Sequence, residues 1–209
     1  MARRQTPQVS SRKQPKQARS NELVTTILQA AVQVLEKEGA SRFTTARVAE
    51  KAGVSIGSLY QYFPNKAAIL FRLQSDEWRQ TLQMLRNILT DQTQSKLERL
   101  RALVHAFIRS ELEEAKMRGA LDDAAPLYRD APEAREAHAE GARVYQDFFD
   151  EILSEHPAET RALVCDIIST TLSTVGKEFS SIPRTSAEME RYAEALADMF
   201  CAYINSLST

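Results

Sequence analysis

Apolar residues recur at intervals of three and four along most of this 209-residue chain, and this spacing constrains the fold more than any other feature. The spacing places apolar side chains on one face of an α-helix. Alanine, leucine, glutamate and arginine, which favour helices, fill the positions between them. Glycine is scarce, with 6 residues, and alternating β-branched runs are absent. The pattern therefore predicts an all-α protein.

Several classes of protein conflict with the sequence. No run approaches the roughly 18 apolar residues that cross a bilayer, and no hydrophobic segment follows the first positive charges. We therefore expect a cytoplasmic protein with no membrane partner. Cys165 and Cys201 lie in apolar stretches without ligand spacing, and His105, His138 and His156 form no metal-binding pattern. We expect neither a metal nor a cofactor.

Positive charge is concentrated in the N-terminal third. Residues 1–66 contain eleven basic and four acidic side chains, a net charge of +7, so residues 67–209 carry −8 within a total of −1. This asymmetry indicates an anion-binding module followed by an acidic domain. Residues 1–19 hold six basic side chains and no acidic one, which predicts a flexible basic arm. A solubilising tail is an equally compatible interpretation of residues 1–11.

Capping residues and helix stops divide residues 20–66 into three helices. The first is expected from Ser20 or Asn21 to Gly39, and the second from a Thr44 or Thr45 cap to Gly53. A third, short helix follows a Ser55 cap and ends before a proline. Two short helices joined by a tight turn predict a helix-turn-helix, although a helical hairpin within a bundle has a similar pattern.

The third helix combines a predicted apolar face, Ile56, Leu59 and Phe63, with small and hydrogen-bonding side chains elsewhere. The residues expected to point away from the core are Gly57, Ser58, Gln61 and Tyr62. Free amides at a helix N-terminus favour a phosphate, a glycine permits close approach, and hydroxyl groups donate to phosphate oxygens. A bundle hairpin explains Leu59 and Phe63 but not this polar cluster beside a basic arm.

The segment "FTTARVAEKAGVSIGSLYQYFPNKAAIL", residues 43–70, resembles the signature of the TetR (tetracycline-repressor-like) transcriptional regulators. The resemblance covers about the first third of the chain, and beyond it the family shares only architecture. It implies about nine helices, with a DNA-binding domain over residues 20–66 and a ligand-binding and dimerisation domain over residues 67–209. It further implies a homodimeric repressor that leaves a near-palindromic operator in double-stranded DNA when a small apolar or aromatic inducer binds.

Position by position, the resemblance implies specific DNA contacts. Thr45 and Tyr60 would bind phosphates, and Ser55 would cap the recognition helix. The other implied contacts are Gly57, Ser58, Gln61 and Tyr62 at bases or backbone, and Lys66 at the start of the fourth helix. Ile56 departs from the polar residue often found there, so thymine methyl contact and DNA shape would contribute more. Arg47 either contacts a phosphate or is an ordinary solvated residue of the surface.

Aromatic residues in the acidic part are the candidates for a ligand cavity, although each one taken alone fits an ordinary core residue equally well. The candidates are Trp78, Phe107, Tyr128, Tyr145, Phe148 and Phe149, with His105 beside them. A lone histidine such as His105 is more often a structural hydrogen-bond donor than a ligand.

The last two predicted helices carry wide apolar stripes within residues 163–175 and 189–207. Pairing with a second copy in a four-helix bundle would bury the excess, whereas the alternative is that the stripes close the core of a monomer. The expected interface residues are Ile167, Leu172, Leu196, Phe200 and Tyr203.

Two other classes of protein remain as alternatives. One is a small helical enzyme that uses Asp122, Asp123 and His105, and the other is a helical adaptor that binds protein through its stripes. No paired nucleophile and base, phosphate-binding glycine loop or metal spacing supports an enzyme, and an enzyme leaves the basic third unexplained. We expect a non-enzymatic DNA-binding regulator.

Overall fold

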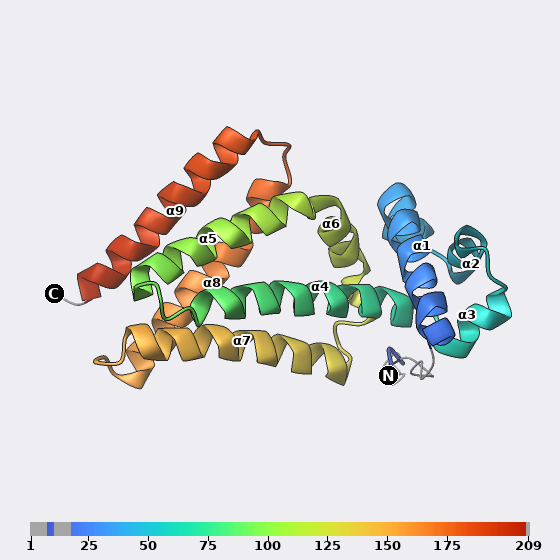
Figure 1. The fold of residues 1–209 in the computed structure, drawn as a ribbon, viewed down its shortest axis with the longest axis horizontal. Helices are drawn as coiled ribbons and strands as arrows, with labels where there is room; N and C mark the ends of the chain where they lie inside the picture. The colour runs from blue at the N-terminus through green and yellow to red at the C-terminus, as the bar shows by residue number, and fades with distance from the viewer. Residues whose placement is uncertain (1–7, 11–17, 208–209) are drawn as a thin grey trace, which may run out of the picture. The chain divides into compact units, whose positions relative to one another are not determined.

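The computed structural model describes residues 8–10 and 18–207, which form nine α-helices, one short 3-10 helix and no strand (Figure 1). The predicted all-α class is confirmed. The elements are α1 Ala18–Arg42, α2 Thr45–Ala52, α3 Ile56–Tyr62, α4 Lys66–Leu89, α5 Lys96–Glu113, α6 Ala115–Ala124, η1 Ala125–Leu127, α7 Pro132–Ile152, α8 Ala158–Ser180 and α9 Ser186–Leu207. None of the helices in this described part is long and apolar enough to cross a membrane.

The predicted stops and caps of the first helices lie close to those observed. Gly39 has a φ of 73° and interrupts α1, but a further helical turn continues to Arg42. The side chain of Thr44 caps α2 by accepting from the amide of Arg47, and Gly53 ends α2 with a φ of 67°. Both glycines occupy a left-handed backbone region that other residues enter at a cost. The turn between α2 and α3 is therefore tight.

The chain forms two compact units. The first comprises the described residues up to Trp78 together with Lys116–His138, and the second comprises Arg79–Ala115 together with the described residues from Ala139 onward. Helices α4 and α7 each contribute to both units, because the division falls within them. The first unit thus extends beyond the predicted DNA-binding domain of residues 20–66 and includes α6.

A buried polar network stabilises the first unit. The hydroxyl group of Tyr128 shares its single hydrogen between two acceptors, Oε1 of Gln74 at 3.0 Å and the carbonyl oxygen of Leu121 at 2.9 Å. Gln74 also donates to Glu77, which forms an ion pair with Arg118 at 2.7 Å. Burial raises the pKa of Tyr128, so its hydroxyl group stays protonated and keeps donating. These contacts join α4 to α6 and to the segment that follows α6.

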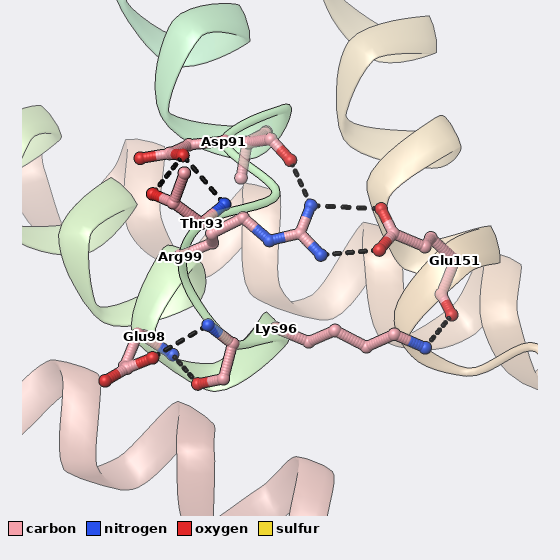
Figure 2. A network of polar contacts seen from close by, with 8 residues as sticks. Asp91, Thr93, Lys96, Glu98, Arg99 and Glu151 are labelled. Atoms are coloured by element: carbon pink, nitrogen blue, oxygen red, sulfur yellow. Dashed lines mark hydrogen bonds and ion pairs between the residues drawn. The ribbon is translucent and has the colours of Figure 1, made fainter.

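The second unit contains the buried guanidinium of Arg99, which is 1% exposed (Figure 2). Arg99 donates to the carbonyl oxygen of Leu89 and to both carboxylate oxygens of Glu151, one of them at 3.1 Å. Lys96 donates to the carbonyl oxygen of Glu151 at 2.7 Å. The hydrogen bonds from Arg99 hold the pKa of Glu151 below its usual value. The network joins the end of α4, the start of α5 and the end of α7.

Candidate nucleic-acid interface

Helix α3 is the predicted recognition helix, and its N-terminus is capped as expected. The Oγ atom of Ser55 accepts from the amide of Ser58 at 3.0 Å and lies 2.8 Å from the Oγ atom of Ser58. Helices α1, α2 and α3 pack together in the first unit. Because the cap and the core fix the orientation of this short helix, its outer face is presented in a defined position.

The outer face of α3 differs in two residues from the expectation. Ile56 is 42% exposed rather than buried, and Tyr62 is 5% exposed rather than pointing outward. Tyr62 lies one helical turn after Leu59, which is fully buried, so the two side chains share the inner face. The residues that α3 exposes most are Ile56, Gly57, Tyr60 and Gln61, while Ser58 is half-buried. The exposed isoleucine is free to contact an apolar group such as a thymine methyl.

Two hydroxyl groups predicted to bind phosphate contact each other across the turn. The Oγ1 atom of Thr45, at the start of α2, lies 3.0 Å from the phenol oxygen of Tyr60 on α3. Two hydroxyl groups carry two hydrogens, and one hydrogen bond between them uses only one. The second hydrogen can be donated to a phosphate oxygen, so the pair can orient the phenol and still bind an anion.

Arg47 has partners within the chain. Its Nη1 atom donates to Oε2 of Glu38 and to the carbonyl oxygen of Arg42, the latter at 2.9 Å. These contacts link the end of α1 to the first turn of α2. The sequence indicated that Arg47 either contacts a phosphate or is a solvated surface residue. The structure shows a third role, in which Arg47 holds the end of α1 against the start of α2.

The start of α4 carries Lys66, which is half-buried, directly after Asn65. The Oδ1 atom of Asn65 accepts from the amide of Ala68 at 2.9 Å, and its Nδ2 atom donates to the carbonyl oxygen of Gln8 at 3.1 Å. Sequence reasoning missed Asn65. An asparagine directly before a predicted helix is a capping signal and would have identified its first role, but not the contact with Gln8.

The predicted ligand-site residues belong to the cores of both units. Tyr128 and Trp78 pack in the first core, and the Trp78 ring lies 4.3 Å from the His138 ring. The residues in the second core are Phe107, Tyr145, Phe148 and Phe149. The Phe148 and Phe149 rings meet edge to face at 5.4 Å, and the Arg99 guanidinium lies 5.4 Å from the Phe148 ring centre. The predicted ligand-site aromatics are therefore divided between two separate cores.

His105 makes contacts between α5 and α9. Its Nε2 atom lies 2.9 Å from Glu194, and its Nδ1 atom lies 3.3 Å from Glu190. This fits the structural role that is more common for a lone histidine. Asp122 and Asp123 are exposed in the first unit, whereas His105 belongs to the second. Within the residues that the structure describes, no group of three or more metal-binding side chains is assembled.

The predicted dimer residues divide into buried and exposed members. Leu172, Leu196 and Phe200 are at most 7% exposed and pack in the core of the second unit, so they cannot also face a partner. This corrects their assignment, and the reason is that α8 and α9 turn these sides toward α5. Ile167 is 41% exposed and Tyr203 is half-buried. Leu163, which begins the predicted stripe of residues 163–175, is 55% exposed, and Met199, which sequence reasoning missed, is 52% exposed.

Three packed helices, the third of them short and capped, with a longer all-α part of the chain after them, define a helix-turn-helix protein with an appended all-α domain. A family model described as "Bacterial regulatory proteins, tetR family" matches residues 27–73. A second, described as "Tetracyclin repressor-like, C-terminal domain", matches residues 95–207, which is more than half of the chain. The chain therefore belongs to the TetR family of transcriptional regulators, as its signature indicated.

The related proteins include nucleoid occlusion factors named SlmA. The chain is 41% identical to the one from Vibrio campbellii over 83 residues, which is 39% of this chain and 42% of that protein. For SlmA of Vibrio cholerae the identity is 37%, with the same coverage. The chain thus matches less than half of the length of these relatives.

Solved structures share the fold over most of the chain. A putative TetR-family regulator from Mesorhizobium loti has a TM-score of 0.68 at 19% identity, covering 90% of this chain and 98% of that one. A TetR/AcrR-family regulator from Thermobifida fusca has a TM-score of 0.69 at 19% identity, covering 87% and 97%. A complex of SmeT with triclosan has a TM-score of 0.63 at 19% identity, covering 87% and 91%. At these identities the likeness shows the fold.

Proposed function

We propose that this TetR-family regulator is a homodimeric repressor. It binds a near-palindromic operator in double-stranded DNA through α3 and leaves the operator when a small apolar or aromatic molecule binds. The observation that carries the DNA-binding part is the exposed glycine at position 57, which the folded chain itself does not require. The dimer and the ligand response have separate support.

Gly57 lies within α3 and has ordinary helical backbone geometry, since no positive φ is found there. A methyl group added at its Cα would have Oγ of Ser55 as its nearest described contact, at 3.8 Å, which is an ordinary van der Waals distance. Glycine in a helix lowers stability by roughly 0.5–1 kcal/mol relative to alanine. The chain therefore keeps a destabilising glycine on an exposed face, which is useful where an external surface such as the DNA backbone approaches closely.

The proposed dimer uses the outer faces of α8 and α9. Leu163, Ile167 and Met199 are large apolar side chains that the chain leaves exposed there. Exposed alanine and threonine residues continue the same faces at helical spacing: Thr170 and Thr174 on α8, and Ala195 and Ala202 on α9. Large side chains beside small ones suit interlocking of two helix pairs around a two-fold axis. The symmetry would place two copies of α3 about 34–36 Å, or a multiple, apart on one side of DNA.

A ligand response is supported by the fold and by the aromatic core of the second unit. SmeT, whose structure in complex with triclosan shares this fold, is an example of a small aromatic ligand on such a scaffold. A ligand bound in the second core would act on α3 through α4, which follows α3 in the chain and ends in the second unit. The aromatic residues expected to contact it are Phe107, Tyr145, Phe148 and Phe149. The coupling free energy between a ligand site and a second binding site is typically about 1–3 kcal/mol.

The test of DNA binding compares two glycine substitutions. Gly57→Ala should weaken binding to a duplex selected from a random-sequence pool by at least about tenfold, because the methyl group would occupy space needed by DNA, while raising thermal stability slightly. Gly119→Ala is the matched control. Gly119 lies exposed within α6, and a methyl group there would meet no described atom within 4 Å.

Gly119→Ala should give a similar gain in helix stability and leave DNA affinity unchanged. Equal affinities of Gly57→Ala and Gly119→Ala would remove α3 from the interface. A wild-type protein that selects no sequence from the pool would overturn the proposed function. Footprinting of the selected duplex then tests for two related half-sites, and a screen of apolar and aromatic compounds for release of that duplex tests the inducer.

A further inference from the structure

The segment that precedes α1 contains one buried apolar side chain. Val9 is 2% exposed and packs in the core of the first unit, whereas its neighbours Gln8 and Ser10 are exposed. Polar and basic residues surround this valine in the sequence. An isolated valine can be buried only if the backbone on both sides of it is held against the protein, so residues 8–10 form a fixed contact.

Two hydrogen bonds hold the same three residues. The Nδ2 atom of Asn65 donates to the carbonyl oxygen of Gln8 at 3.1 Å. The hydroxyl group of Ser10 donates to Oε1 of Glu133, in the first turn of α7, at 3.2 Å. Asn65 directly precedes Lys66, the expected phosphate contact at the start of α4. The contact therefore lies beside the DNA-reading end of the first unit.

This contact shortens the tether of the basic residues that precede it. Arg3 and Arg4 lie outside the described residues, but covalent geometry limits their reach in any conformation. An extended chain spans at most about 3.6 Å per residue, so Arg4 can be no more than about 18 Å from Val9, against about 50 Å from Ala18 if Val9 were free. Effective concentration falls roughly as the −3/2 power of tether length, which gives about a fivefold advantage for the shorter tether.

We propose that Val9 is a positioning residue for DNA binding. It fastens residues 8–10 beside the start of α4, which shortens the tether of the basic residues that precede them and raises their effective concentration at DNA phosphates near the one that Lys66 would contact. The basic arm then acts at a defined place on the duplex rather than only as a diffuse charge. This inference rests on the proposed DNA-binding function, so its first test is made without DNA.

The first experiment measures labelling of introduced thiols by a maleimide. The Val9→Cys and Gln8→Cys variants place a thiol at a buried and at an exposed position of the same segment. Both native cysteines are buried, and burial raises the pKa of the Cys165 thiol to about 11, so background labelling is slow. We expect labelling at least about tenfold slower in Val9→Cys than in Gln8→Cys, because the buried site must open first. Equal rates would overturn the fixed contact.

The second experiment measures DNA affinity with charge-matched variants. Val9→Asp and Gln8→Asp add the same charge to adjacent residues, but only the first removes the buried side chain. Val9→Asp should bind the selected duplex about fivefold more weakly than Gln8→Asp. The Arg3→Ala, Arg4→Ala double variant should weaken the wild type, and its effect should shrink in the Val9→Asp background, since the two changes remove one interaction.

A general loss of structure would not produce this coupling between Val9 and the two arginines. If Val9→Asp disturbs the fold, Val9→Ala replaces it in this test, because it removes less apolar surface and adds no charge. Val9→Ala should show the same coupling to the two arginines. Additive effects, or equal affinities of Val9→Asp and Gln8→Asp, would overturn the proposal even if the thiols label at different rates. If the wild type binds no duplex but Val9→Cys is still protected from labelling, the proposed DNA-binding function is wrong while the buried contact is real. In that case the proposed role of Val9 in DNA binding is wrong as well.

Discussion

The hydroxyl oxygen of Thr45 and the phenol oxygen of Tyr60 lie 3.0 Å apart, which ties the first turn of α2 to the exposed face of α3. Tyr60→Phe removes this bond and any phosphate contact of the phenol, while the ring itself stays. We expect DNA binding to weaken by a similar factor for the selected duplex and for random duplexes, because phosphate contacts carry no sequence information. Fluorescence anisotropy against both duplexes measures the two factors.

Lys66→Ala separates phosphate neutralisation from hydroxyl contacts in the same assay. The slope of log affinity against log salt concentration should fall by about one for Lys66→Ala, as expected for one lost phosphate neutralisation, and should not change for Tyr60→Phe. An unchanged slope in Lys66→Ala would remove this lysine from the interface. A loss confined to the selected duplex would contradict a phosphate role for Tyr60.

Gln61 is the exposed side chain of α3 best suited to read a base, because its amide can donate to and accept from adenine together. Gln61→Ala should reduce affinity for the selected duplex by about 1–3 kcal/mol and leave binding to random duplexes nearly unchanged. Repeating the sequence selection with the variant should relax the preference at one position in each half-site. Equal losses on both duplexes would show that Gln61 touches only the DNA backbone.

Local features of the sequence were predicted more reliably than the faces of its helices. Gly39, Thr44, Gly53 and Ser55 act as stops and caps through their own backbone and nearest neighbours, so the sequence alone locates them. The outward position expected for Tyr62 was wrong, because a seven-residue helix has too few apolar residues to define which side is buried.

Long-range contacts could not be read from the sequence. On α9, Phe200 of the predicted stripe packs within the chain, whereas its neighbour Met199, which the stripe left out, is exposed. Helical spacing does not tell which neighbouring element covers each side of the helix. Arg47 and Glu38 are nine residues apart across two helix ends, so no periodic pattern pairs them. Val9 is a single apolar residue, and a single residue has no periodicity at all.

The ion pair of Glu151 with Arg99 predicts a pH-dependent stability. Arg99 lowers the pKa of Glu151 in the folded state below its ordinary value of 4.5. A lowered pKa means that the carboxylate stabilises the fold above the ordinary pKa, and that this contribution is lost as pH falls through the folded value. Glu151→Gln should therefore lower the free energy of unfolding by about 1–3 kcal/mol at pH 7, because buried Arg99 loses its charged partner.

The difference between Glu151→Gln and the wild type should begin to narrow below about pH 4.5, and it should close only once the pH falls through the lower pKa that the carboxylate has in the folded state. Urea unfolding at pH 7 and near pH 3 measures it. Glu155→Gln, at an exposed carboxylate after α7, is the control and should change stability little at either pH. A loss of equal size at both pH values would show that packing of the side chain, rather than its charge, stabilises the unit.

The exposed apolar side chains of α8 and α9 predict how the dimer can be disrupted. Ile167→Glu and Met199→Glu place a charge on the proposed interface without entering the core, so each protomer should keep its helicity and unfolding free energy. Burying these carboxylates in a dimer without partners would be costly, and we expect monomers in sedimentation equilibrium that lose binding to the selected duplex. Ile182→Glu is the matched control, because Ile182 is 54% exposed but follows the end of α8. It should remain dimeric and keep DNA affinity, whereas dimers that survive both Ile167→Glu and Met199→Glu would place the interface elsewhere.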